Sequence, residues 1–217
     1  MKISKEDMLL YAVTDRFWLG EDSLAEVVER LLIGGVTCVQ LREKNLGHEE
    51  FVAQGLELKA VCEKFCVPFI INDNIQVALE VGADGVHIGQ ADMQIQCARE
   101  LLGPDKIIGT STHNVSEAIA AWEQGVDYLG CGAVFGSSTK TDVTTLNHHV
   151  LADICKEVPL PVVAIGGINE RNGGQLAGIG VDGIAVISAL FAKADKVAAA
   201  RGMKDIARIV AEIDYEE

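Results

Sequence analysis

The chain has 217 residues, of which 49% are hydrophobic, 22 are glycine and four are proline. This composition excludes collagen and disorder, and it fits a buried parallel sheet with many tight turns. The formal net charge of −14 argues against nucleic acid or an anionic membrane as a partner, so a phosphate site would have to gather its few cations locally.

The length suits one large domain, and it lies near the lower end of the range of about 200 to 400 residues for (β/α)8 barrels. The first seven residues hold no apolar signal core, and no segment approaches the roughly 20 apolar residues of a membrane span. We therefore expect a cytoplasmic protein. Its six cysteines include no Cys-x-x-Cys pair and are expected to be reduced thiols.

One pattern recurs four times: a helix-like run, then Gly-x-Thr or Gly-x-Asp, then a short apolar segment. The glycine of the triplet is Gly35, Gly82, Gly125 or Gly180. A βαβ unit needs at least about 30 residues, so intervals of roughly 50 residues predict two strand–helix steps each. Four repeats at this spacing predict an α/β fold, a closed (β/α)8 TIM barrel in a single domain over residues 1–217. Its active site would lie at the carboxyl ends of the strands.

Short apolar runs give the strands in chain order. Ser23 and Glu26 form a capping-box pattern at the start of the first helix, and Asn114 with Glu117 predicts the start of a later one. A long helix is expected at 48–65. The strands are expected at 9–13, 36–41, 68–71, 85–88, 106–110, 127–131, 161–165 and 183–187.

The second strand ends on a cluster of cations and an amide. Alternation sends Gln40, Arg42 and Lys44 to one side, toward the barrel mouth, with Leu41 and Glu43 between them. Arginine offers a bidentate fork and lysine a point charge, which suits a multiply charged anion. The alternative is an ordinary solvated loop in which Arg42 pairs with Glu43 or another neighbour.

Two aspartates follow neighbouring strands. Asp73 comes just after the third strand and Asp92 after the fourth. Mg²⁺ typically binds through one or two carboxylates plus substrate phosphate oxygens, so this pair favours a magnesium site. Each aspartate alone could instead be a helix N-cap.

A polar loop follows the sixth strand. Ser137, Ser138, Thr139 and Lys140 offer hydroxyls, backbone N–H groups and a cation, which together suit an anion. The same residues could form a polar surface turn.

The last strands end on further candidates. A glycine pair ending at Gly167 and the pair Ile187 and Ser188 lie where such barrels bind a phosphate, although a glycine pair can also be only a tight turn. Ser111, at the end of the fifth strand, is expected to donate a hydrogen bond to a ligand beside the proposed metal. The usual pKa of histidine would allow His113 to act as a general acid or base, but a lone histidine at a helix start more often has a structural role. Two anion sites across one mouth indicate a transferase that joins two phosphorylated small molecules.

These residues resemble the thiamine phosphate synthase family, also called thiamine-phosphate pyrophosphorylases. The resemblance spans nearly the whole barrel, in the family's order. Its pieces are Gln40-Leu41-Arg42-Glu43-Lys44, Asn72-Asp73, Gly85-Val86-His87-Ile88-Gly89-Gln90 with Asp92, Ser111-Thr112-His113, Thr139-Lys140, Ala164-Ile165-Gly166-Gly167-Ile168 and Ile187-Ser188.

The resemblance implies condensation of a hydroxymethylpyrimidine diphosphate with a thiazole phosphate, or its carboxylated form, giving thiamine monophosphate and diphosphate. It implies Mg²⁺ held by Asp73 and Asp92. It implies that Ser137, Thr139, Gly167, Ile187 and Ser188 bind the thiazole phosphate, and that the pyrimidine diphosphate is bound by Gln40, Arg42, Lys44, Asn72, Ser111 and Lys140. Leu41, Glu43 and Ser138, which stand between these residues in the same segments, are also expected to bind substrate. Arg42, Lys44, Lys140 and Ser111 are the expected catalytic residues.

The chain departs from the family's Pro-Thr-x-Thr-Lys pattern after the sixth strand, because Gly136 and Ser137 stand in place of proline and threonine. Two alternatives remain open. A thiazole tautomerase-like barrel would use His113 and need no diphosphate site, and a non-catalytic phosphometabolite-binding barrel would release no diphosphate. The sequence also leaves open a homo-oligomer.

Overall fold

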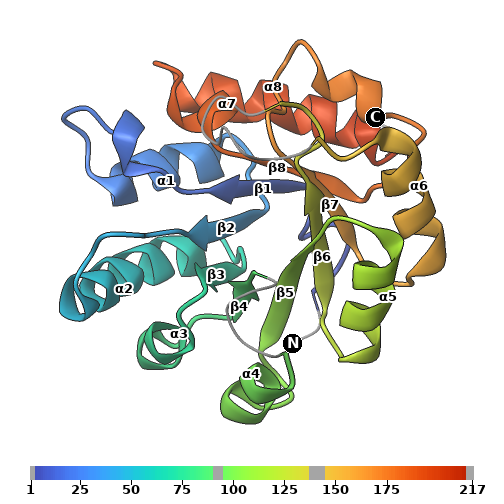
Figure 1. Ribbon diagram of the computed structural model, residues 1–217. Helices are drawn as coiled ribbons and strands as arrows, with labels where there is room; N and C mark the ends of the chain where they lie inside the picture. Colours follow the sequence, from blue (N-terminus) through green and yellow to red (C-terminus); the bar gives the residue numbers. More distant parts are fainter. Residues whose placement is uncertain (1–2, 90–94, 137–144, 214–217) are drawn as a thin grey trace.

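The computed structural model describes residues 3–89, 95–136 and 145–213. Eight parallel strands close into a barrel in sequence order, with β8 paired to β1 (Figure 1). The barrel predicted from the glycine spacing is confirmed. The strands are β1 (Leu10–Val13), β2 (Cys38–Leu41), β3 (Phe69–Asn72), β4 (Gly85–Ile88), β5 (Ile107–Thr112), β6 (Tyr128–Gly132), β7 (Val162–Ile165) and β8 (Gly183–Val186).

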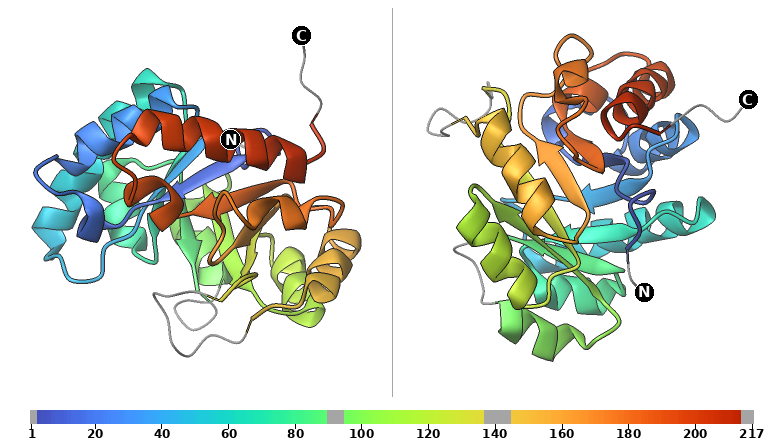
Figure 2. Two further views of the ribbon diagram at one scale, coloured as in Figure 1. Left: turned by 90° about the horizontal axis from the view of Figure 1, so that it is seen from above. Right: turned by 90° about the vertical axis from the view of Figure 1, so that its right-hand side faces the viewer.

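Helices surround the barrel on the outside, as the views from above and from the side show (Figure 2). They are α1 (Leu24–Ile33), α2 (His48–Lys64), α3 (Ile75–Val81), α4 (Ile95–Leu102), α5 (Val115–Glu123), α6 (His148–Glu157), α7 (Ser188–Phe191) and α8 (Lys196–Val210), with short 3-10 helices η1 (Arg16–Trp18) and η2 (Gly173–Leu176). Each described helix is too short or too polar to cross a bilayer.

Local sequence signals set the helix starts. Ser23 and Glu26 form the predicted capping box at α1, and the Asn114 side chain accepts a hydrogen bond from the Glu117 amide at α5. Both predicted helix starts are confirmed.

The end of β5 differs from the prediction because polar residues continue its pairing with the next strand. β5 continues two residues past the expected end at Thr110, because Ser111 and Thr112 pair with Gly130 and Cys131 of β6. Ser111 therefore lies in the sheet, and not in a loop after it.

The hydrophobic core has two layers separated by the sheet. The outer layer lies between strands and helices and includes Leu41, Val86 and Leu129. The inner layer fills the barrel itself with large side chains such as Met8, Tyr11, Ile70, Ile107 and Tyr128. Such filling is typical of TIM barrels, in which the interior is a packed core and not a pore.

Candidate active site

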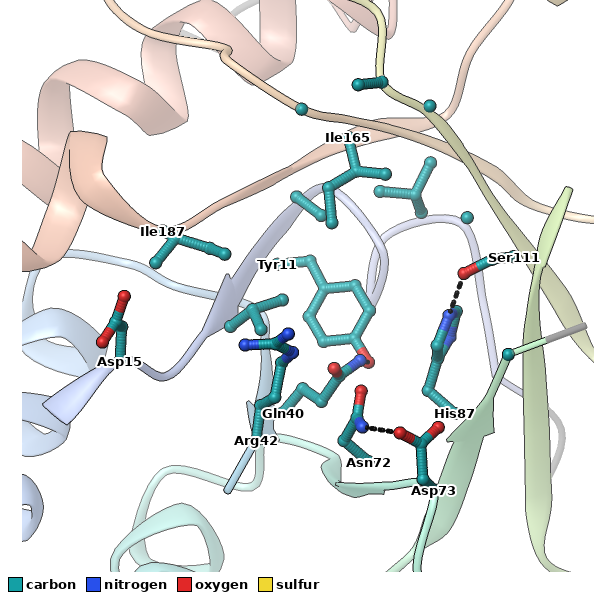
Figure 3. Close-up of a pocket in the computed structure, with 18 of the residues that line it drawn as sticks. Tyr11, Asp15, Gln40, Arg42, Asn72, Asp73, His87, Ser111, Ile165 and Ile187 are labelled. Carbon is teal, nitrogen blue, oxygen red and sulfur yellow. Dashed lines mark hydrogen bonds between the residues drawn. The ribbon is translucent and has the colours of Figure 1, made fainter. Parts of the chain in front are cut away.

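A cavity of about 580 Å³ lies among the residues at the carboxyl ends of the strands (Figure 3). Every strand of the barrel contributes to it, directly or through the loop that follows. The lining residues are Tyr11, Val13, Asp15, Gln40, Arg42, Lys44, Asn72, Asp73, His87, Gly89, Ser111, His113, Gly130, Gly132, Ala133, Val163, Ile165, Gly166, Ala185 and Ile187.

The second strand brings its cations and amide into the cavity as alternation predicted. Gln40, Arg42 and Lys44 all line it. The Arg42 amide donates to Thr14 Oγ1 at 2.9 Å, which ties the end of β2 to the end of β1. This contact fixes the backbone from which the Arg42 side chain extends.

Leu41 and Glu43 were also expected among the substrate-binding residues, but their side chains are not among those that line the cavity. The pleat turns Leu41 to the helix side, where it is fully buried in the outer core. The Glu43 side chain is only 6% exposed and lies 3.5 Å from Arg16 Nε, outside the set of cavity-lining residues. Burial raises the pKa of this carboxyl group, with Arg16 opposing the shift.

The third strand places Asn72 and Asp73 at the cavity mouth. Asp73 has φ of 61°, a left-handed conformation that aspartate tolerates better than most residues, and its amide donates to the His87 carbonyl at 2.8 Å. Asn72 Nδ2 donates to Asp73 Oδ2. These contacts fix the Asp73 carboxylate among the cavity residues (Figure 3). Asp92, its predicted partner, lies outside the described residues.

The fifth strand brings Ser111 and His113 to the cavity. Ser111 Oγ lies 3.0 Å from His87 Nε2. His113 Nδ1 lies 3.0 Å from Glu117 Oε2, so this histidine is paired with the first turn of α5.

Sequence reasoning missed a chain of polar groups in the barrel interior. Gln40 Nε2 donates to the Tyr11 hydroxyl at 2.7 Å, and the Tyr11 and Tyr128 hydroxyls lie 2.8 Å apart. The Tyr128 hydroxyl lies 2.9 Å from His87 Nδ1, and His87 continues to Ser111. Burial lowers the pKa of His87 to about 4, so the ring is neutral at pH 7.

Two glycines make room for this row of hydrogen-bonded side chains. Their positions inside strands were the sequence signal for it. A Cβ on Gly109 would lie 2.0 Å from Tyr128 Cζ, and one on Gly130 would lie 3.1 Å from His87 Cε1. Glycine inside a strand often marks such a close approach.

The last two strands contribute mainly backbone and apolar surface. Ile165, Gly166 and Ile187 line the cavity, whereas Gly167 and the exposed Ser188 lie next to them in the chain without lining it. At Gly167, φ is +69°, and a Cβ would lie 2.8 Å from the Phe135 carbonyl oxygen. The predicted anion loop, Ser137, Ser138, Thr139 and Lys140, lies outside the described residues.

The fold and the cavity together define a class of protein. Two cations, two amides and two carboxylates gather at the carboxyl ends of the strands, the place where (β/α)8-barrel enzymes bind and convert small molecules. A model of the family described as thiamine monophosphate synthase matches residues 10–190. The chain belongs to this family, and it is an enzyme of the transferase class, of the kind that acts in thiamine biosynthesis.

Relatives and a solved structure agree with that assignment. The chain is 45% identical over 203 residues to a thiamine-phosphate synthase of Ruminiclostridium cellulolyticum, covering 94% of this chain and 97% of the relative. It is 47% identical over 207 residues to that of Clostridium acetobutylicum, covering 95% of each. The solved thiamine phosphate pyrophosphorylase of Pyrococcus furiosus superposes with a TM-score of 0.87 at 38% identity, covering 95% of this chain and 98% of the other.

Proposed function

We propose that this enzyme condenses 4-amino-2-methyl-5-(diphosphooxymethyl)pyrimidine with a thiazole phosphate, in its plain or carboxylated form, to give thiamine monophosphate and diphosphate. The observation that carries the proposal is the convergence of Gln40, Arg42, Lys44, Asn72 and Asp73 on one cavity. The protein has a net charge of −14, so an anionic substrate would have its most favourable electrostatic interaction with this local group of cations.

Arg42 and Lys44 suit a diphosphate because the planar guanidinium can grip two oxygens while the ammonium approaches a third. As the diphosphate departs, negative charge grows on its bridging oxygen. Preorganised cations stabilise this state more than the ground state, and that difference accelerates the reaction. Lys140, outside the described residues, is proposed to act with them.

The donor set fits Mg²⁺. Asp73 offers a carboxylate held in place by Asn72, and Asp73 with Asp92 would hold the ion together with substrate oxygens. When bound, Mg²⁺ would neutralise charge on the diphosphate.

The thiazole phosphate is proposed to lie across the cavity, toward Gly166, Gly167, Ile187 and Ser188. Ser137, Ser138 and Thr139 would complete this side. Holding the thiazole nitrogen close to the pyrimidine methylene removes the need for a protein nucleophile, and positioning of two reactants can contribute up to about 7–11 kcal/mol.

The test is a mixture of both substrates with Mg²⁺ and the purified enzyme, followed by measurement of thiamine monophosphate and diphosphate. We expect both products in equal amounts. Binding without either product would favour a non-catalytic barrel and overturn the proposal.

The matched variant is Asp73→Asn. Asparagine keeps the size of aspartate and tolerates its left-handed backbone, so the variant removes the charge and little else. We expect turnover to fall at least about 100-fold while the thermal midpoint stays within a few degrees. Lys64→Ala, on an exposed lysine of α2 that pairs with Glu29, is the control and should keep full activity. A tautomerase that relies on His113 would instead be almost unaffected by Asp73→Asn.

A further inference from the structure

The polar chain inside the barrel has a direction, which can be deduced from the number of protons that each member carries. The chain runs from Gln40 through Tyr11, Tyr128 and His87 to Ser111, with successive separations of 2.7, 2.8, 2.9 and 3.0 Å. Tyr11 and Tyr128 are almost completely buried. Burial raises both tyrosine pKa values well above their usual range, so each hydroxyl keeps exactly the one proton that it can donate.

Gln40 sets the direction at one end. Its amide nitrogen can only donate, so the Tyr11 oxygen accepts, and the Tyr11 proton is left for the Tyr128 oxygen. Tyr128 then accepts from Tyr11, and its own proton is left for His87 Nδ1. Every buried hydroxyl thus donates once and accepts once.

His87 continues the same direction of hydrogen-bond donation to Ser111. A neutral imidazole carries one proton, and the hydrogen bond made by one ring nitrogen decides which nitrogen holds it. Because Nδ1 accepts from Tyr128, the proton lies on Nε2 and is donated to Ser111 Oγ. Ser111 therefore cannot give its own proton to His87 and directs it elsewhere.

We infer that Tyr128 is a positioning residue: it holds His87 in the Nε2-protonated tautomer and thereby makes Ser111 a hydrogen-bond donor toward the substrate. The role of Ser111 in holding an anionic substrate rests on the proposed function, but the tautomer does not. Tyr128 acts through His87, and it is not itself among the residues that line the cavity.

The space around the chain shows why one hydroxyl can fix this arrangement. The Tyr128 ring occupies the room left by Gly109, and His87 lies against Gly130. The two rings lie 5.5 Å apart, centre to centre, and the barrel core surrounds Tyr128 on all sides. The Tyr128 ring is therefore held by close packing, next to the His87 ring that it contacts.

The first experiment is ¹⁵N NMR of the histidine-labelled protein without substrate. Long-range ¹H–¹⁵N correlations distinguish a protonated from an unprotonated ring nitrogen, and loss of one signal set in His87→Gln assigns the residue. At pH 7 we expect His87 as the neutral tautomer with its proton on Nε2. A proton on Nδ1 would mean that the Gln40 amide is turned over and the whole chain runs backward, which overturns the inference.

Two matched variants test the part played by Tyr128. Tyr128→Phe removes the donor to Nδ1, so the His87 signals should move to values averaged between the two tautomers. Tyr11→Phe removes the neighbouring hydroxyl, but Tyr128 still has only Nδ1 to donate to, so the Nε2-protonated tautomer should persist. An unchanged His87 spectrum in folded Tyr128→Phe would overturn the inference.

Kinetics then separate positioning from mere packing. Tyr128→Phe should raise the KM for the diphosphate substrate about tenfold in the otherwise wild-type enzyme, and less than twofold in a Ser111→Ala background, where no donor remains to be oriented. Equal effects in both backgrounds would show that Tyr128 acts only through packing. If the enzyme makes no product at all, the proposed function fails while the spectra still decide the tautomer.

Discussion

At the scale of single residues, the barrel interior is packed by pairs in which a glycine on one strand leaves space for a large side chain on the neighbouring strand. Gly109 of β5 is paired with Tyr128 of β6 in the sheet register. A Cβ at position 109 would lie 2.0 Å from Tyr128 Cζ, which no small rearrangement can relieve. The same tyrosine holds Tyr11 and His87 by hydrogen bonds, so the pair affects both stability and the cavity.

Gly109→Ala is therefore expected to lower the free energy of unfolding by about 3 kcal/mol or more, through overpacking and loss of the Tyr128 hydrogen bonds. Urea unfolding measures the change. Gly202→Ala is the control, because a Cβ there meets nothing within 4 Å and alanine suits the middle of α8 better, with an expected gain of up to about 1 kcal/mol. A normal stability for Gly109→Ala would contradict this description of the interior.

At the scale of elements, the sequence predicted those features that local chemistry decides. The capping box of α1, the Asn114 N-cap of α5 and the apolar runs located these two helix starts and all eight strands. Alternation along β2 placed Gln40, Arg42 and Lys44 in the cavity. It could not place Tyr11 and Tyr128 together, because their contact crosses the barrel between residues 117 positions apart. It also assigned Leu41 and Glu43 to the site because they stand between Gln40, Arg42 and Lys44 in the chain, although Leu41 packs in the outer core and Glu43 lies beside Arg16.

The capping box of α1 gives an element-scale prediction. Ser23→Ala removes the oxygen that accepts from the Glu26 amide at 3.2 Å, and should cost about 1 kcal/mol, or roughly 2–4 °C in the thermal midpoint. Scanning calorimetry measures it. Ser116→Ala, at an exposed position inside α5, makes no cap and should leave the midpoint unchanged or slightly higher. Equal losses in the two variants would show that the cap adds nothing.

At the scale of the whole molecule, closure of the sheet joins every strand to two neighbours, and β8 pairs with β1 in the same way as the other neighbours pair. The sheet therefore has no open edge. The two layers of core, inside and outside the sheet, both run round the ring. We expect such a structure to unfold as one cooperative unit.

The two tryptophans can test that cooperativity. Trp18 lies in η1 after β1, and Trp122 lies in α5, after β5. Each single variant leaves one tryptophan, so the fluorescence of Trp122→Phe reports on Trp18. The fluorescence of Trp18→Phe reports on Trp122. Within each variant, the fluorescence and far-UV circular dichroism transitions in urea should coincide. A fluorescence midpoint displaced from the circular dichroism midpoint in either variant would indicate that a part of the barrel unfolds separately.

The tight contact between Gly109 and Tyr128 also has an evolutionary consequence. Because the barrel interior is closely packed, we expect a larger residue at one of these positions to be inherited only with a smaller one at the other. Among relatives of this enzyme, the two positions should therefore vary together, and lineages that lost the tyrosine should have had to find another way to orient the imidazole.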